Sequence, residues 1–494
     1  MTSADHHPNT FSIEVVPSPC VIIIFGATGD LTKRKIMPSL CQLCSNGLLH
    51  EHTSIVACGR TAHSTKSFGE YIRTYIQKCA PHKTKKSCLL EKITYVRTDP
   101  NDPQTFNDLA AHLNEKNKSE TAAPLNYLFY FAVPPASAET LIAALSNAGL
   151  LTEKDPDAWR HLALEKPFGS DLQSALDLDH FLHQHIAEDN IYRIDHYLAK
   201  ETVQNILITR FANRIFETIW DHHAIDHILI STSETVGLEG RNAYFDKSGL
   251  LRDMFQSHLM EILMLIAMEP PESFEAETIH AAKLKLIKSI RPFTNESIAS
   301  DVIRAQYTEG NDMPGYLQEP DIPADSMTET FIAMKLFIDN DRWKDVPIYM
   351  QAGKRMRTQD SAIKIVFKPS TRSIFSQQLA KSLTSNTLTL RIRPDEGMGL
   401  NLQAKHNGPK LAIGNITFDT TYDQHSNNPD APDAYARLLL DAMLHDHTLF
   451  VRSKTIIESW RLFTPIMTAW QNNPAKYPLL SYPAGSDGPR LDDA

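Results

Sequence analysis

The sequence predicts a doubly wound, Rossmann-like α/β domain followed by an α+β domain with a large, mainly antiparallel sheet and flanking helices. In the first part of the chain, short apolar runs alternate with amphipathic helical stretches, which is typical of a parallel sheet covered on both faces. In the second part, apolar runs follow one another with few helices between them, as in an antiparallel sheet. A length of 494 residues also exceeds the usual size of one compact core, so two domains are expected.

The first domain is expected at residues 19–190, after a flexible N-terminus at residues 1–18. Its predicted strands are residues 20–26, 53–59, 92–98, 125–133 and 161–169. The helical patterns that follow these strands cover residues 35–49, 67–80, 104–115, 137–149 and 170–186. Because each strand is apolar along its whole length, both faces of the sheet should be buried under helices.

The second domain is expected at residues 191–472. Its predicted strands are residues 227–234, 329–339, 346–354, 362–368 and 386–394, and its long helical patterns cover residues 250–268, 433–446 and 455–471. Residues 473–494 are rich in proline, glycine and aspartate, and we expect a loose C-terminal tail there.

Charge and hydropathy exclude two classes of partner. The net charge is −10 at pH 7, whereas nucleic acids and anionic membrane surfaces select basic proteins, so neither partner is expected. The first residues lack the basic and apolar segments of a secretory leader, and no apolar run reaches the length of a membrane span. A cytoplasmic protein is therefore expected.

The segment IFGATGDL, at residues 24–31, ends the first predicted strand and opens a helix. Glycines there let backbone amides approach a pyrophosphate, and the helix N-terminus adds its positive dipole. No Gly-Lys-Ser/Thr sequence follows, which argues against a nucleoside triphosphate loop. We expect the cofactor to contact Gly26, Ala27, Thr28, Gly29, Asp30 and Leu31.

The end of the second predicted strand indicates which dinucleotide is bound. An acidic residue at this point accepts the ribose hydroxyls of NAD, but the sequence here is CGRTAHS, with Arg60 and no acid. A guanidinium suits a 2′-phosphate, so NADP is favoured, although a surface arginine would look the same.

Residues 193–201, RIDHYLAKE, concentrate polar groups of several kinds. If this segment is helical, His196 and Lys200 stand four residues apart and project to one side, where they could bind an anion. Asp195 would point elsewhere. Exposed helix faces carry charges by default, however, so a solvated surface explains the pattern equally well.

His258 lies on the apolar stripe of the predicted helix at residues 250–268, and it should therefore face the interior. Taken alone, a histidine in such a position is more often a buried structural residue than a catalytic one. It becomes a candidate catalytic residue only in the company of other functional groups.

Several segments together show which family the chain resembles. It is similar to the glucose-6-phosphate dehydrogenases over roughly residues 20–470, in GATGDLTKRKIMPSL, EKPFG, IYRIDHYLAKE, FANRIF, EGRNAYFDKSGLLRD and QSHLMEILMLIAME. The resemblance implies oxidation of glucose 6-phosphate at C1 to 6-phosphoglucono-1,5-lactone, with hydride transfer to NADP, the first step of the oxidative pentose phosphate pathway. It also implies a homodimer or homotetramer associated through the large sheet.

The resemblance further implies a role for each site residue. His258 would be the general base for the C1 hydroxyl, and Asp195 would orient it. The implied substrate-binding residues are Lys166, His196, Tyr197, Lys200, Glu234, Asp253 and Lys354, with Lys166 also next to the nicotinamide. A base of near-neutral pKa and a hydride acceptor are sufficient for this oxidation, so no metal is expected.

Two other hypotheses belong to different functional classes. A related aldose dehydrogenase could act on another sugar or prefer NAD, which Arg60 and the cluster around Lys200 disfavour. A non-catalytic relative could bind nucleotide as a regulatory subunit, but such a protein would be expected to lack either His258 or Asp195.

Overall fold

The computed structural model describes residues 15–79, 87–120, 126–153, 155–156, 158–370, 374, 383–407, 412–422 and 433–491. The chain forms two compact units that do not follow one another simply along the sequence. The first unit contains residues 1–165, 185–192 and 430–446, and the second contains residues 166–184, 193–429 and 447–494. A single boundary near residue 190, as expected from the sequence, is therefore too simple.

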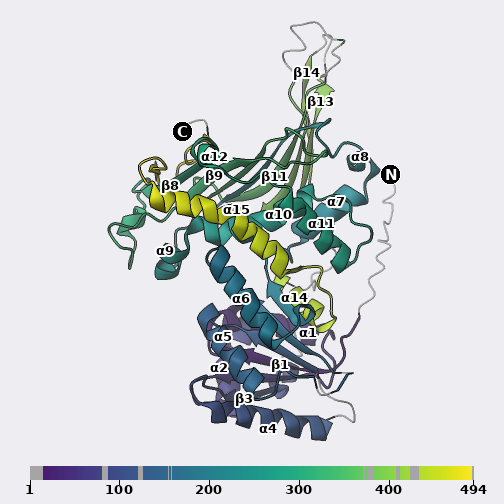
Figure 1. The fold of residues 1–494 in the computed structure, drawn as a ribbon. Helices are drawn as coiled ribbons and strands as arrows, with labels where there is room; N and C mark the ends of the chain where they lie inside the picture. Colours follow the sequence, from purple (N-terminus) through teal and green to yellow (C-terminus); the bar gives the residue numbers. More distant parts are fainter. Residues whose placement is uncertain are drawn as a thin grey trace. The chain divides into compact units, whose positions relative to one another are not determined.

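A parallel sheet forms the core of the first unit (Figure 1). Its strands are β1 (Cys20–Phe25), β2 (Ser54–Gly59), β3 (Ile93–Arg97), β4 (Asn126–Phe131) and β5 (Arg160–Glu165), in the order β5-β4-β1-β2-β3. All neighbouring pairs are parallel, and every residue of β1 and β4 is buried. Strands β6 (Ile191–Ile194) and β15 (Phe450–Val451) complete a seven-stranded sheet, in which β15 is antiparallel to β6. The predicted doubly wound α/β architecture is confirmed.

Helices follow the strands as the amphipathic pattern predicts. They are η1 (Thr32–Ile36), α1 (Met37–Ser45), α2 (Thr65–Cys79), α3 (Ser87–Glu91), α4 (Pro103–Glu120), α5 (Pro135–Asn147), α6 (Leu172–His185) and η2 (Glu188–Asn190). Helix α6 was expected in the first domain, but all of it except its last residue belongs to the second unit. Helix α14 (Ala434–Met443) was expected in the second domain but belongs to the first unit. Helix α14 packs against α1. The Asp433 side chain caps α14 and also accepts a 2.8 Å hydrogen bond from the Ser39 hydroxyl in α1.

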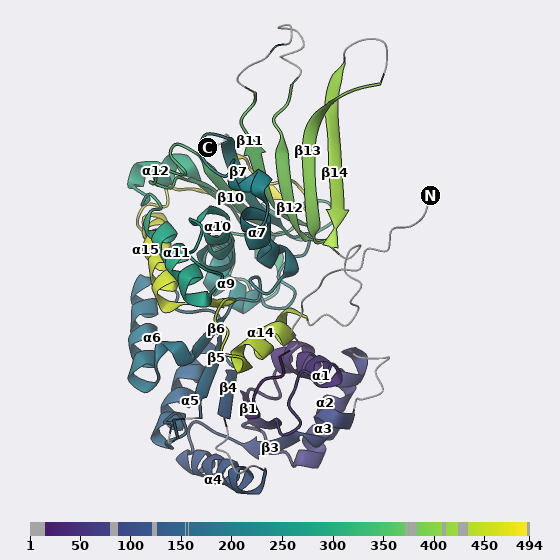
Figure 2. The ribbon, with the colours of Figure 1, turned by 90° about the vertical axis from the view of Figure 1, so that its right-hand side faces the viewer.

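The second unit is built on a nine-stranded sheet, which appears with its long outer strands β13 and β14 in Figure 2. The strand order is β14-β13-β12-β11-β7-β10-β9-β8-β16. The strands are β7 (Ile225–Ser233), β8 (Val302–Thr308), β9 (Phe331–Leu336), β10 (Ile348–Gly353), β11 (Asp360–Phe367), β12 (Thr387–Arg393), β13 (Gly397–Lys405), β14 (Ile413–Thr421) and β16 (Leu479–Pro483). Most pairs are antiparallel, as predicted, but β10 runs parallel to β7 and β16 runs parallel to β8.

The prediction of a loose tail at residues 473–494 is wrong for residues 479–483. These residues form β16, which pairs with β8 through a register that joins Leu479 to Arg304. The Tyr482 side chain is buried, and its hydroxyl donates a 2.6 Å hydrogen bond to the carbonyl of Lys354. Proline and glycine on both sides of this short strand conceal it in the sequence.

Helices of the second unit lie beside this sheet (Figures 1 and 2). They are α7 (Glu201–Phe211), α8 (Arg214–Glu217), α9 (Asn242–Leu250), η3 (Leu251–Leu259), α10 (Met260–Ala267), α11 (Ala276–Lys288), α12 (Asn295–Asp301), η4 (Tyr316–Gln318) and α15 (Ser453–Asn472). The predicted helix at residues 250–268 exists, but its first half, η3, is a π-helix that follows a kink at Gly249. Such wide turns are uncommon and often accompany functional sites. Among the described residues, no helix is both long and apolar enough to cross a membrane.

Candidate active site

The turn after β1 has the geometry expected of a phosphate-binding loop. Gly26 has φ of 82°, and a Cβ atom at this residue would lie 2.2 Å from the carbonyl oxygen of Ala132. The helix that follows begins at Asp30, and the first amides of a helix lack partners within it. A side chain at residue 26 would clash with this carbonyl, and glycine at this residue also allows a ligand to approach the backbone closely.

The other predicted cofactor residues divide into two groups. The backbone amides of Gly26 and Ala27 donate hydrogen bonds to the carbonyl of Cys58, so these two amides are not available to a cofactor. The amide of Gly29 likewise donates to the carbonyl of Gly26 at 2.9 Å, so Thr28, Asp30 and Leu31 remain as candidates for backbone contact with a pyrophosphate. The Asp30 side chain is exposed and forms a 2.9 Å ion pair with Arg34.

Arg60 directly follows β2, the strand next to β1 in the sheet. Its side chain is exposed, and its carbonyl accepts a hydrogen bond from Arg97 at 3.3 Å. This is the position from which a side chain can reach the ribose of a dinucleotide bound at the turn after β1. The placement of Arg60 agrees with the hypothesis of a 2′-phosphate contact.

Replacement of Gly26 by alanine should weaken both the fold and cofactor binding. The added Cβ must move the Ala132 backbone, and the positive φ adds further strain, so we expect the free energy of unfolding to fall by roughly 2–4 kcal/mol. Urea unfolding and NADP titration would measure the two effects. Gly47→Ala is the matched control, because Gly47 also has positive φ but a Cβ atom there would meet no other atom within 4 Å. Equal losses in both variants would contradict the steric argument.

A buried histidine–aspartate pair lies in the second unit. Asp195 follows β6, His258 lies in η3, and the distance between Asp195 Oδ1 and His258 Nδ1 is 2.5 Å. The amide of Tyr197 donates a second hydrogen bond to Oδ1 at 2.9 Å. Although burial opposes ionisation, the contact with His258 holds the pKa of Asp195 well below its usual range. The two side chains are 2% exposed, so this bond is shielded from water.

Residues 195–200 form turns, and the helix begins only at Glu201. The assumption that His196 and Lys200 share a helix face is therefore wrong. The cluster arises from a tight turn instead, stabilised by the hydrogen bond from the Tyr197 amide to the Asp195 side chain. This bond within the turn, of the kind that aspartate often forms, competes with helix formation locally.

The ammonium group of Lys166 contacts the second nitrogen of the His258 ring, Nε2. Its Nζ lies 2.6 Å from His258 Nε2 and donates to Asp253 at both the side chain, 2.9 Å, and the backbone carbonyl, 2.8 Å. Burial lowers the pKa of His258 below its ordinary value of 6.5, the Asp195 carboxylate opposes this effect, and the Lys166 charge adds to it. A neutral imidazole that donates from Nδ1 and accepts at Nε2 satisfies all of these contacts.

Two predicted anion-binding side chains contact the same histidine, and a third contacts one of these two. The Tyr197 ring stacks on His258 at a centroid distance of 4.2 Å, and the His196 ring meets it edge-on at 4.8 Å. Lys200 Nζ lies 4.7 Å from the centre of the Tyr197 ring. His196, Tyr197 and Lys200 are thus brought together with His258, as the sequence-based hypothesis requires.

The electrostatics of this cluster favour an anion. Burial lowers the pKa of Lys200 to about 8, and the positive charge of Arg393 is the next largest cause. Burial also lowers the pKa of His196 to about 3, with His258 as the next cause. Lys200 and Arg393 carry like charges that repel each other, so an anion bound between them would stabilise both, while the neutral His196 ring can donate a hydrogen bond to it.

Glu234 and Lys354 form a second pair in this unit. Lys354 Nζ lies 2.6 Å from Glu234 Oε2, and it also lies 5.1 Å from the centre of the Phe245 ring. Lys354 is buried, and the Tyr482 hydroxyl donates to its carbonyl. All of the substrate-binding residues expected from the sequence therefore belong to the second unit.

Arg393 and Glu396 are not among the residues expected to bind substrate, yet both lie near the anion cluster. Their charges act on the pKa of Lys200, and Glu396 accepts a 2.8 Å hydrogen bond from the Thr202 amide. Arg393 ends β12, so its position at a strand end was the signal available in the sequence.

Among the described residues, three groups of side chains could hold a metal ion, and one of these groups lies at this site. Asp195, His196 and His258 each offer one ligand atom, and these atoms lie within 4.8 Å of one another. The direct hydrogen bond between His258 Nδ1 and Asp195 Oδ1 already uses two polar atoms of this group, and a carboxylate-oriented imidazole is sufficient for general base chemistry.

A parallel sheet with a glycine turn suited to a dinucleotide, together with a hydrogen-bonded histidine–aspartate pair, is typical of the oxidoreductases that use a nicotinamide cofactor. Residues 23–205 match the family model "Glucose-6-phosphate dehydrogenase, NAD binding domain", and residues 207–494 match "Glucose-6-phosphate dehydrogenase, C-terminal domain". The chain therefore belongs to the glucose-6-phosphate dehydrogenase family.

Individual relatives agree with this assignment. A glucose-6-phosphate 1-dehydrogenase of Chlamydia muridarum is 39% identical over 488 residues, which cover 96% of this chain and 94% of the relative. That of Bacillus subtilis is 37% identical over 478 residues, or 96% of each chain. A solved structure of a glucose-6-phosphate dehydrogenase in complex with glucose 6-phosphate superposes with a TM-score of 0.89 at 32% identity, covering 97% of this chain and 98% of that one.

Proposed function

We propose that the protein oxidises glucose 6-phosphate at C1 to 6-phosphoglucono-1,5-lactone, with NADP as the hydride acceptor. The observation that carries this proposal is the hydrogen bond between His258 and Asp195 beside the cluster of His196, Tyr197 and Lys200. A base and an anion site in one unit suit a sugar whose phosphate and reacting carbon are at opposite ends of the molecule.

His258 acts as the general base. Its Nδ1–H donates to Asp195, which leaves the lone pair of Nε2 for the proton of the C1 hydroxyl. In the structure, the Lys166 ammonium group lies against Nε2 and uses this lone pair. The sugar hydroxyl must therefore take the place of Lys166 at Nε2 before its proton can be transferred. Asp195 then stabilises the imidazolium that forms, without itself taking the proton.

The remaining groups bind and orient the sugar phosphate. His196, Tyr197 and Lys200 hold the 6-phosphate, while Asp253, Glu234 and Lys354 contact the sugar. Asp253 suits a contact with sugar hydroxyls because the Lys166 ammonium holds the pKa of its carboxyl well below the usual range, although burial alone would raise it. An ionised carboxylate accepts hydrogen bonds from two hydroxyls.

The direct test is a turnover assay of the purified wild-type protein. Glucose 6-phosphate with NADP should be oxidised at the highest kcat/KM, and free glucose at a much lower value because it lacks the phosphate. NAD should be the poorer acceptor. Absence of turnover with glucose 6-phosphate under either dinucleotide would contradict the proposed function, and preference for another aldose would support a related dehydrogenase.

Replacement of Arg60 by alanine should weaken NADP binding but not NAD binding. The lost charge-assisted contact with the 2′-phosphate should cost roughly 1.5–3 kcal/mol, or about 10- to 150-fold in the KM for NADP. Steady-state kinetics with each dinucleotide would measure this difference. Arg73→Ala, at an exposed position in α2, is the matched control and should change neither KM value. Equal losses with NADP and NAD would mean that Arg60 has a structural role.

A further inference from the structure

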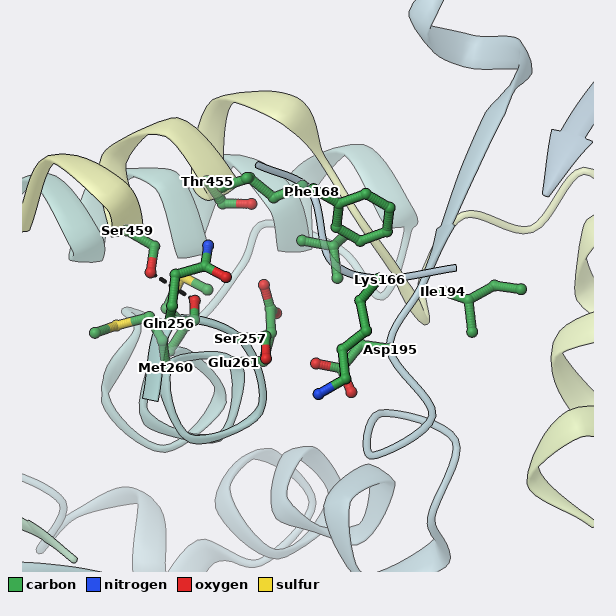
Figure 3. Close-up of a pocket in the computed structure, with 13 residues that line it drawn as sticks. Lys166, Phe168, Ile194, Asp195, Gln256, Ser257, Met260, Glu261, Thr455 and Ser459 are labelled. Atoms are coloured by element: carbon green, nitrogen blue, oxygen red, sulfur yellow. Dashed lines mark hydrogen bonds between the residues drawn. The ribbon is translucent and has the colours of Figure 1, made fainter. Parts of the chain in front are cut away.

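A small cavity adjoins the catalytic pair inside the second unit (Figure 3). The volume open to the centre of a water molecule is about 20 Å³, which is enough for one water. Asp195 lines this cavity, whereas His258 and Tyr197, the partners of its Oδ1 atom, do not. We therefore place the second oxygen, Oδ2, on the cavity side of the carboxylate.

Asp195 Oδ2 is buried and has no hydrogen-bond partner among the residues that the structure describes. Burial of a charged oxygen without a partner is costly, and native proteins satisfy most such atoms with a protein group or an ordered water. The carboxylate stays ionised because of His258, so the demand for a donor at Oδ2 is strong.

The cavity also contains the side chain of Glu261, one turn beyond His258 in α10. Glu261 Oε2 accepts a 3.0 Å hydrogen bond from Lys283 in α11, and both side chains are almost fully buried. Burial raises the pKa of Glu261, Lys283 lowers it, and the Asp195 charge raises it again. Two carboxyl groups therefore meet at one cavity, and neither can donate to the other when both are ionised.

A water molecule has the chemistry that this cavity requires, because its two O–H groups can donate to two carboxylates at once. The water can also accept a hydrogen bond from a polar group of the lining, such as the side-chain amide of Gln256. The hydroxyl of Ser459, also in the lining, already donates to the Gln256 carbonyl at 2.6 Å. The remaining lining includes apolar Phe168 and Met260 and also Lys166, whose ammonium group is already in contact with Asp253 and His258.

We propose that one water molecule binds in this cavity, donates to Asp195 Oδ2 and to Glu261, and thereby positions the Asp195 carboxylate against His258. Lys283 anchors Glu261 and so fixes the far side of the water site. Glu261 and Lys283 touch neither the substrate nor the reacting atoms, and they act as positioning residues. The inference rests on the proposed function for its kinetic consequence, but the water site itself does not.

The positioning has a catalytic consequence because the imidazole follows the carboxylate. With both oxygens bonded, the Asp195 carboxylate cannot rotate about its own axis, and His258 Nδ1 keeps one fixed acceptor. Partners beyond the first contact shell commonly change activity by about 10- to 100-fold when they are removed. The expected loss here appears in kcat, since the groups that bind the phosphate are not involved.

Two double variants that differ at a single residue provide the test. E261M/K283M replaces the buried ion pair by apolar side chains of similar length, a change that is often neutral or stabilising for the fold. E261Q/K283M keeps a polar amide at the cavity. We expect E261M/K283M to lose about tenfold or more in kcat at nearly unchanged KM for glucose 6-phosphate, and E261Q/K283M to recover most of this loss.

A matched control replaces a different ion pair of the same unit, Lys335–Asp301, by Lys335→Met and Asp301→Leu and should leave kcat unchanged. A high-resolution crystal structure of the wild type should show density for a water within hydrogen-bonding distance of Asp195 Oδ2 and Glu261. Equal kcat values in the two double variants, or a cavity without such density, would overturn the proposal. Failure of the wild type to oxidise glucose 6-phosphate would instead overturn the proposed function, while the density would still decide the water site.

Discussion

Replacement of His258 by asparagine should lower kcat by about 10²- to 10⁴-fold, the usual contribution of a positioned proton transfer. Binding of glucose 6-phosphate and NADP should stay near the wild-type level, because the phosphate-binding groups remain. Turnover under saturating substrates and equilibrium titration of each ligand would separate the two effects. Asp195→Asn should give a smaller fall, since it disturbs the orientation of the imidazole without deleting the base.

A second buried histidine supplies the control for His258. His280, in α11, contacts the His447 carbonyl at 2.9 Å, and burial lowers its pKa to about 3. His280→Asn should reduce stability and leave turnover of the folded protein intact. A His258→Asn protein that folds, binds both ligands and turns over within about tenfold of the wild type would refute the mechanism.

If His258 is the base, as proposed, it should also set the acid side of the pH profile. His258 must be neutral to accept a proton, so kcat/KM is expected to fall when the pH drops through the pKa of the free enzyme. Burial lowers this pKa below 6.5, with Asp195 opposing and Lys166 adding to the effect. We therefore expect full activity at neutral pH and loss only below about pH 6.5.

Replacement of Lys200 by alanine should raise the KM for glucose 6-phosphate by roughly 10- to 100-fold, the effect of losing one charge-assisted contact with phosphate. The residual activity with free glucose should hardly change, because glucose has no phosphate to contact. Kinetics with both sugars would show the difference. Part of the loss can appear in kcat, since binding energy at the phosphate helps to place the reacting carbon.

Lys288, an exposed lysine of α11, provides the control for Lys200. Lys288→Ala should leave the kinetics with both sugars unchanged, which excludes a general effect of lower positive charge. A parallel loss on glucose 6-phosphate and on glucose in Lys200→Ala would show that Lys200 serves folding or the chemical step.

The sequence predicts the first sheet well because its strands are apolar along their whole length. CVIIIF in β1 and NYLFYF in β4 are fully buried, and a run of this kind has few other interpretations. Strands β13 and β14 were not predicted, since their mixed side chains, such as those of NLQAK and IGNITFDTT, are mostly exposed or half-buried. A strand with little buried surface leaves only a weak pattern in the sequence.

Individual contacts in the candidate site were also difficult to predict from the sequence. Asp195 and His258 are separated by 63 positions, and only the resemblance to a known family paired them in advance. Helical periodicity placed His258 inside correctly but gave the wrong conformation for residues 195–200, where the side chain of Asp195 bonds the backbone of a turn. The contacts of Lys166 with His258 and of Glu261 with Lys283 depend on tertiary packing, which spacing along the chain does not encode.

The placement of α14 constrains how the protein is synthesised. The helix packs against α1, and its Ala442 carbonyl lies 2.9 Å from His161 Nδ1, yet it is made almost four hundred residues after α1. While the ribosome is translating the segments in between, the first sheet exists without one of its covering helices. The first unit therefore reaches its complete packing only after nearly the whole chain has been made.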